Sequence, residues 1–263
     1  MNKIITLVKK EWREVFRNRF VLFSVAFMPL IFTAIPLGVL YGIAASGDAG
    51  DFSSAMVSDQ LPELCENLST AECGQYVAIT MFMPLFLMMP VIIPITIAAY
   101  SIVGEKVTRT LEPLLATPIT TVELLAGKGI AAGGPAVLAT WLSFFIFIVG
   151  ALLMRLPLKV ISNLFHPLWL LGIFVLGPLL AIAAISLAVM VSSRTTDPRV
   201  AEQISGLFIL PLVALVLGQA TGFLIINQTL MIWMTLGVAL LDIGLLAFAV
   251  QLFQRESILT RWK

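Results

Sequence analysis

The segment 104–128 carries charged side chains between two long apolar stretches, with a spacing that suits ion pairs or a partner protein. Glu105, Arg109 and Glu112 lie three or four residues apart, which places them on one face of a helix. The pattern predicts a short charged helix at the end of an apolar stretch.

A break and a second helix are expected to follow. Pro113 and Pro118 limit the helices that flank them, and Thr117-Pro118 is typical of a chain break. A short helix over 120–127 would then carry Glu123 toward the next apolar stretch. Taken alone, this helix–break–helix is also compatible with an ordinary loop.

Few other residues have the type and spacing that a metal site, an ATP site or a catalytic site requires. One histidine and two cysteines are too few for a structural zinc site. Gly127-Lys128 lacks the upstream glycine and the following Ser or Thr of a phosphate-binding loop, so we expect no ATP site and no enzyme in this chain. An intramembrane hydrolase needs a nucleophile and a base within the bilayer, but His166, the sole histidine, falls at the edge of a span.

Four methionines near the second apolar stretch offer thioethers to copper(I). Adaptable apolar packing explains them more simply, and we expect no metal and no cofactor in this chain. These residues are Met81, Met83, Met88 and Met89.

The composition indicates what must position these residues. Of 263 residues, 59% are hydrophobic and 12% charged, about half the usual charged share, which leaves too little polar surface to coat a soluble globule. The apolar stretches lack the period-2 alternation of a membrane β-barrel. The sequence therefore predicts an all-α polytopic integral membrane protein, a single permease domain over 1–263.

Six stretches are long enough to cross a bilayer core of about 30 Å. The long uncharged stretch before Asp242 has a polar break at Asn227 and Gln228, so it supplies two spans. The predicted spans are 20–45, 77–103, 129–153, 167–191, 204–222 and 230–252.

The basic residues are sorted between the two sides of the membrane. The segments 1–19, 104–128, 192–203 and 253–263 carry 14 of the 16 Lys and Arg residues. By the positive-inside rule these segments, with both termini, are cytoplasmic, and the acidic segment 46–76 is an external loop. Cys65 and Cys73 both lie in that loop, where we expect a disulfide; two free thiols are the alternative.

The N-terminal segment 1–19 is amphipathic. Apolar residues recur at helical spacing and basic residues fill the other face, so an interfacial helix is predicted, with Trp12 at headgroup depth and Arg13 and Arg17 toward anionic lipid. Composition alone favours a plain membrane anchor; the alternative is an element that partner proteins displace.

Asp242 is the sole acidic residue well inside a predicted span, so it should face protein or water. It either belongs to a cation or proton pathway or is a protonated or hydrogen-bonded packing residue, and the second interpretation is favoured. Pro84, Pro90 and Pro94 should kink the second span, which suits a helix that bends as access changes, although prolines are frequent in membrane helices.

Two stretches resemble the signature of ATP-binding-cassette (ABC) permeases of the second type, which is approximately E-[KR]-x-x-G-T-L-E-x-L-L-x-T-P and then E-L-L-x-G-K. They are EKVTRTLEPLLATPI (105–119) and ELLAGK (123–128), and the charged start KKEWRE (9–14) is also similar to the family. Arg109 stands where the family usually has glycine.

The resemblance implies a permease that dimerises with a second copy or a paralogue. ATP and magnesium would be bound by two separate ATPase subunits, and the helix 1–19 and the loop 104–128 would couple to them. Residues that would contact or position the ATPase are Glu105, Lys106, Arg109, Glu112, Glu123 and Lys128, with a subsidiary contact at Arg194, Asp197 and Arg199. The resemblance further implies short re-entrant helices around 223–229.

We therefore expect the membrane subunit of an ATP-driven exporter in the cell membrane, with a route between two permease copies and no nucleic-acid partner. A low-charge route favours an amphipathic or hydrophobic substrate. A secondary, ion-gradient-driven transporter using Asp242 is the alternative; such carriers often contain two inverted halves, and no convincing repeat is visible.

Overall fold

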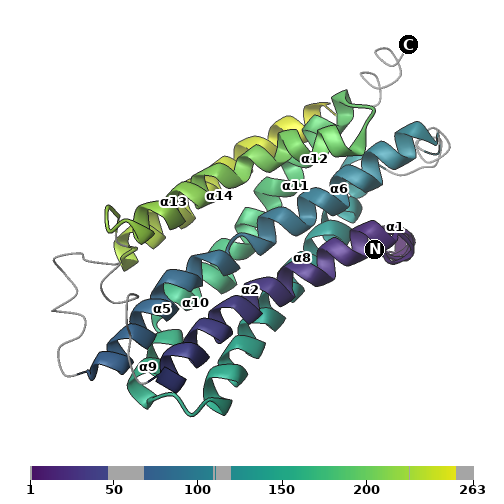
Figure 1. Ribbon diagram of the computed structural model, residues 1–263. Helices are drawn as coiled ribbons and strands as arrows, with labels where there is room; N and C mark the ends of the chain where they lie inside the picture. The colour runs from purple at the N-terminus through teal and green to yellow at the C-terminus, as the bar shows by residue number, and fades with distance from the viewer. Residues whose placement is uncertain (1, 47–67, 109, 111–119, 225, 253–263) are drawn as a thin grey trace.

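The computed structural model describes residues 2–46, 68–108, 110, 120–224 and 226–252 (Figure 1). Over these residues the chain is helical, without a strand, and six segments are long and apolar enough to cross a membrane. They are Val21–Ser46, Thr70–Val107, Val122–Leu153, Leu158–Arg194, Pro198–Ala220 and Gln228–Ala249. The predicted all-α polytopic fold with six spans is confirmed.

The helices run roughly along one bundle (Figure 1). α6 (Met89–Val107) and α11 (Gly177–Arg194) pack on each other at its centre, α2 (Arg19–Ser46) and α8 (Thr121–Leu153) lie on one side, and α13 (Leu210–Ala220) and α14 (Gln228–Leu252) lie on the other. α1 (Asn2–Arg17) and the last turn of α14 lie at the same end, which we name the terminal end. The opposite, distal end holds α9 (Leu158–Leu164) and the start of α5 (Thr70–Phe86).

Helix caps move two element boundaries from their predicted positions. Ser69 and Glu72 form a capping box, with Ser69 N donating to Glu72 Oε2 at 2.8 Å, so α5 begins at Thr70 and not at the predicted 77, and the predicted loop 46–76 ends earlier. Thr120 and Glu123 form the same motif, with Thr120 N donating to Glu123 Oε2 at 2.8 Å. α8 therefore runs unbroken from Thr121, and the separate helix 120–127 before a span starting at 129 is wrong.

The last three spans also differ in detail from the predicted limits. The fourth begins before 167 with α9, then continues through α10 (Pro167–Leu171), a π-helical stretch (Gly172–Leu176) and α11. The fifth begins before 204 with α12 (Pro198–Gly206), whose N-cap is Asp197. Between α13 and α14, none of the described residues 221–224 and 226–227 is helical, and Gly222 lies in a turn at φ 70°. The expected re-entrant helices around 223–229 are therefore wrong there, because the connection is too short.

The second span is interrupted, as its prolines predict. α5 ends at Phe86 and α6 begins at Met89, with Leu87 and Met88 forming a turn. Pro90 falls in the first turn of α6, where a missing N–H removes no helical hydrogen bond. Pro84 and Pro94 lie inside the two helices, and all three rings are buried in the interior of the bundle.

Three proline-freed carbonyls are satisfied by side chains from other helices. A proline at position i leaves the carbonyl of residue i−4 without its helical donor. Pro135 frees Ala131 O, which accepts a hydrogen bond from Trp12 Nε1 at 3.1 Å, and Pro84 frees Thr80 O, which accepts from Gln219 Nε2 at 3.0 Å.

The third case uses the wider register of the π-helical stretch. In a π-helix the N–H of residue i+5 donates to the carbonyl of residue i, as Gly177 N does to Gly172 O. The carbonyl of Ile173 would need the N–H of residue 178, but Pro178 has none. The carbonyl of Ile173 instead accepts from Trp141 Nε1 of α8 at 3.3 Å. These side chains join helices at the points where proline interrupts them, as an apolar solvent requires.

Candidate functional site

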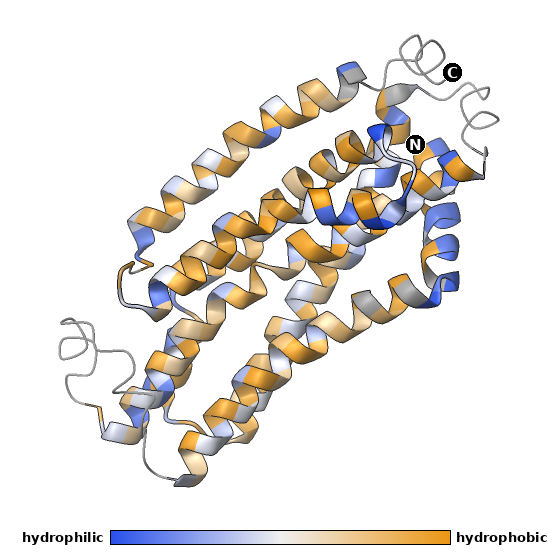
Figure 2. Ribbon diagram, turned by 45° about the horizontal axis from the view of Figure 1, so that its top comes forward, coloured by the Kyte–Doolittle hydropathy of each residue, from blue (hydrophilic) through white to orange (hydrophobic). Residues whose placement is uncertain are grey.

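A cluster of charged side chains lies at the terminal end, where α1 meets α6 and α8. It comprises five residues, which we name the charged cluster: Lys10, Glu11, Ser101, Glu105 and Lys128. Hydrophilic residues gather in this part of the molecule, whereas the long helices are mostly hydrophobic (Figure 2). The cluster therefore connects α1 to both helices that flank the loop region after Val107.

Lys128 of α8 is at the centre of the charged cluster. Its Nζ lies 2.9 Å from Glu11 Oε1, 2.7 Å from Glu105 Oε2 and 2.8 Å from Ser101 Oγ. Ser101 in turn donates to Glu11 Oε2 at 2.5 Å. Glu11, Glu105 and Lys128 are 2%, 4% and 6% exposed, so these charges are removed from solvent and compensated by one another.

Lys10 completes the cluster from the solvent side. Its ammonium pairs with Glu105 and lies 3.7 Å from Glu11 Oε1 and 3.5 Å from Glu14 Oε1. Two lysines thus face the two buried glutamates, which makes the cluster formally neutral. Removing any one partner would leave an uncompensated buried charge.

The pKa shifts of the two α1 residues agree with this pairing. Burial alone would raise the pKa of Glu11, but the charge of Lys128 and hydrogen bonds from Ser101 and Lys128 lower it below 4.5. Burial would lower the pKa of Lys10, but its hydrogen bond to Glu105 and the carboxylates around it raise it above 10.5. Both residues are held in their charged forms.

Two further contacts fix α1 on α8. Leu7 is buried against Gly127, where an added Cβ would lie 2.5 Å from Leu7 Cδ2, so only glycine allows this approach without displacement. Trp12 is half-buried, and its indole bonds Ala131 O. The buried stripe of α1 is therefore Leu7, Glu11 and Val15, whereas the apolar residue Ile5 is exposed.

Three carboxylates of this region could offer oxygen ligands to a cation. Ligand oxygens of Glu11, Glu14 and Glu105 lie within 4.8 Å of one another, beside a cavity of about 320 Å³ between α1 and α6. Hard cations prefer such oxygens. However, Lys10 and Lys128 already compensate Glu11 and Glu105, so the arrangement is that of an ion-pair network.

Of the remaining residues expected to face an ATPase, some are bonded within the fold and others are exposed. Lys106 donates to the carbonyls of Ser193 at 3.0 Å and Thr195 at 3.1 Å, at the end of α11. Asp197 Oδ1 accepts from Arg199 N at 2.8 Å as a helix cap. Arg194 and Arg199 are exposed. Arg13 and Arg17 of α1, which were expected to face anionic lipid, are exposed as well.

The carboxylate of Glu123 accepts the capping hydrogen bond from Thr120 N. It also forms an ion pair with Lys3 of α1, whose Nζ lies 4.0 Å away. Arg109 and Glu112 lie outside the described residues. Cys73 is disulfide-bonded, and its predicted partner Cys65 also lies outside the described residues.

The intramembrane residues singled out from the sequence do not join the charged cluster. Asp242 of α14 is 4% exposed, and neither carboxylate oxygen has a hydrogen-bond partner among the described residues. Pro84 of α5 and Pro90 and Pro94 of α6 are buried in the single chain, without a second copy.

Sequence reasoning missed Glu11, Lys10 and Ser101 as parts of this site. The available signal was the position of Glu11, which stands four residues from both Leu7 and Val15 and so shares their face of a helix. An acid in a buried stripe requires a cation, and Lys128, placed directly before an uncharged span, is a candidate for that cation.

The family comparison agrees with this architecture. A family model described as ABC-2 family transporter protein matches residues 5–253, which include most of α1, the charged cluster and all six spans. No curated protein matches the chain significantly. Because the match covers nearly the whole chain, the protein belongs to the ABC-2 family of transporter membrane proteins and is a multi-pass permease component of an ABC transporter.

Proposed function

We propose that this permease is driven by separate ATP-hydrolysing subunits that dock at the terminal end and displace α1 and the loop after α6. The charged cluster is the observation that carries the proposal. It ties α1 to α6 through Glu105 and to α8 through Lys128, so these three helices form one connected unit. Force applied to α1 or to the loop would reach two spans at once.

The mechanism follows from the packing of those spans. α6 and α11 form the centre of the bundle, and α6 begins at the interruption Leu87–Met88. Displacement of the terminal ends of α6 and α8 would therefore alter packing at the centre, with the interruption as the flexible point. Shifts between discrete packed arrangements are a common means of changing access.

The charge pattern supports the orientation. The terminal end carries α1, Arg194 and Arg199, so the positive-inside rule makes it cytoplasmic and gives both termini that side of the cell membrane. ATP and magnesium would be held by the partner subunits, since this sequence lacks a phosphate-binding loop. A dimer of permeases, identical or paralogous, completes the proposed assembly.

The test begins with copurification of an ABC ATPase with the tagged chain, followed by reconstitution of the complex in vesicles. We expect ATP-dependent transport that a protonophore does not abolish. Lys128→Met should separate ATP hydrolysis from transport, while Lys9→Met, which removes an exposed lysine of α1, should not. Transport that persists without any ATPase and stops with the protonophore would overturn the proposal in favour of an ion-gradient carrier.

A further inference from the structure

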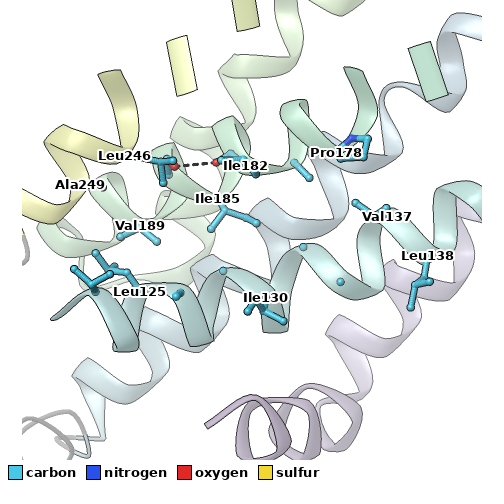
Figure 3. A pocket seen from close by; sticks show the side chains of 17 residues that line it. Leu125, Ile130, Val137, Leu138, Pro178, Ile182, Ile185, Val189, Leu246 and Ala249 are labelled. Atoms are coloured by element: carbon cyan, nitrogen blue, oxygen red, sulfur yellow. Dashed lines mark hydrogen bonds between the residues drawn. The ribbon is translucent and has the colours of Figure 1, made fainter. Parts of the chain in front are cut away.

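An apolar pocket opens between α8, α11 and α14, and no residue of the charged cluster lines it (Figure 3). Its volume is about 590 Å³, within the range of roughly 300–1,000 Å³ that is usual for small-molecule sites. α11 contributes Ile182 and Ile185, α8 contributes Ile130 and Val137, and α14 contributes Leu246 and Ala249. Ile130, Ile182 and Leu246 also have exposed surface, so the pocket opens on the side of the bundle.

Glycines of α8 keep this space free. An added Cβ at Gly129 would meet nothing within 4 Å, and one at Gly133 would lie 3.0 Å from Ile185 Cδ1. The lining is almost wholly apolar, and Ser186, whose hydroxyl donates to Ile182 O at 2.9 Å, is the hydroxyl-bearing residue in it. Such a lining favours a hydrophobic molecule that enters from the bilayer.

Asp242 does not line this pocket itself but lies on α14 one helical turn before the lining residue Leu246. It precedes Leu246 by four residues and Ala249 by seven, so all three share one face of α14, with Asp242 about 6 Å along the helix from Leu246. The flanking Leu241 and Ile243 are 42% and 68% exposed, whereas Asp242 is 4% exposed, so its side chain faces the interior of the bundle. α14 packs mainly on α11.

The contacts of the Asp242 carboxylate show no structural role for it among the described residues. Neither oxygen is bonded to a described residue, and an unpartnered acid in a membrane span costs free energy. A ligand of opposite charge would remove that cost. From the apolar lining and this acid on the same helix face, we propose that the pocket binds a lipophilic monocation whose charge pairs with Asp242.

This inference deepens the proposed function by naming the class of cargo, and it rests on that function only for the transport step. Binding itself requires no ATPase. It can therefore be measured on the isolated permease, and failure to copurify an ATPase would leave the binding result intact.

The test uses labelled tetraphenylphosphonium and the permease in phosphatidylcholine nanodiscs, with tetraphenylborate as an anion of the same shape. We expect saturable binding of the phosphonium and much weaker binding of the borate. Asp242→Asn should weaken phosphonium binding at least about tenfold, because a buried charge loses its partner, while Asp242→Glu should retain most of it. Asp242→Asn should also unfold at an equal or higher temperature, which separates loss of binding from loss of folding.

A second part of the experiment fills the pocket with a larger side chain. Gly129→Leu should reduce binding strongly, whereas Gly244→Leu, at an exposed glycine of α14 that also has open space around it, should not. Equal binding by the wild type and Asp242→Asn would overturn the charge pairing. Equal binding of phosphonium and borate, or binding unaffected by Gly129→Leu, would show partition into lipid and would overturn the site.

Discussion

The indole N–H of Trp12 donates to the carbonyl of Ala131, the carbonyl that Pro135 leaves without a helical donor. The N-terminal helix α1 is thereby joined to the span formed by α8 at a point where the backbone of that span needs a donor. Trp12 thus packs against α8, which makes α1 part of the packed structure.

This relationship predicts a coupled effect of two substitutions. Trp12→Phe should lower the free energy of unfolding by about 1–2 kcal/mol, because the carbonyl of the buried residue Ala131 loses its donor. In a Pro135→Ala background, the backbone at that position regains its N–H and can supply the helical hydrogen bond, so the same substitution of Trp12 should cost less. A double-mutant cycle measured by denaturation in detergent gives the coupling, and additive effects would contradict it.

The charged cluster predicts strong penalties for single neutralisations. Lys128→Met or Glu105→Gln should each destabilise the permease by about 3–5 kcal/mol, because each leaves a buried charge uncompensated. The double variant should be less destabilised than the sum of the two. Thermal unfolding of the purified protein measures this, with Lys9→Met as the exposed control; equal stability of Lys128→Met and Lys9→Met would remove the cluster from the fold.

The close approach of α1 to α8 predicts an engineered disulfide. The ideal Cβ position of Gly127 lies 3.4 Å from Leu7 Cβ, near the range of about 3.5–4.5 Å found in disulfides. Leu7→Cys with Gly127→Cys should therefore cross-link on mild oxidation. If α1 and α8 move as one unit, coupled ATPase activity should survive oxidation; activity lost on oxidation and restored by a reductant would contradict that.

The pH dependence of α1 docking follows from the pKa shifts of Glu11 and Lys10. The lowered pKa of Glu11 stabilises the fold above pH 4.5, and this contribution is lost as pH falls through the folded-state pKa. The raised pKa of Lys10 stabilises the fold below pH 10.5, and this contribution is lost as pH rises through the folded-state pKa. The stability difference between the wild type and Glu11→Gln should thus be constant near neutrality and shrink in acid; a difference that grows in acid would contradict the pairing.

Two substitutions of Glu123 distinguish its role as a helix cap from the role of its charge. Glu123→Gln keeps an oxygen for Thr120 N and should retain coupling, whereas Glu123→Lys should cost about 1 kcal/mol of helix stability and uncouple ATP hydrolysis from transport. Glu112→Lys is expected to uncouple as well. Substrate-stimulated ATPase activity of the reconstituted complex measures these effects, and unchanged stimulation in both lysine variants would exclude the two residues from the interface.

The sequence by itself determined the fold class and the number of spans, because about twenty apolar residues in a row have one stable arrangement in lipid, a helix with all backbone groups bonded internally. The interruption of the second span followed in the same way from the chemistry of proline. Of the helix starts, the predicted 120 was close to the observed Thr121, whereas the predicted 77 missed the Ser-x-x-Glu capping signature at 69–72, which is present in the sequence.

Only the tertiary structure decided which charges face each other. Glu11, Glu105 and Lys128 are separated by long stretches of sequence, and no local pattern states that they meet in a buried cluster. The same holds for Trp12 at Ala131 and for Asp242 beside an apolar pocket. Periodicity reports which face of a helix is apolar, but the partner of a buried polar group depends on how the helices pack, and that is set by shape and hydrogen bonding between segments far apart in the chain.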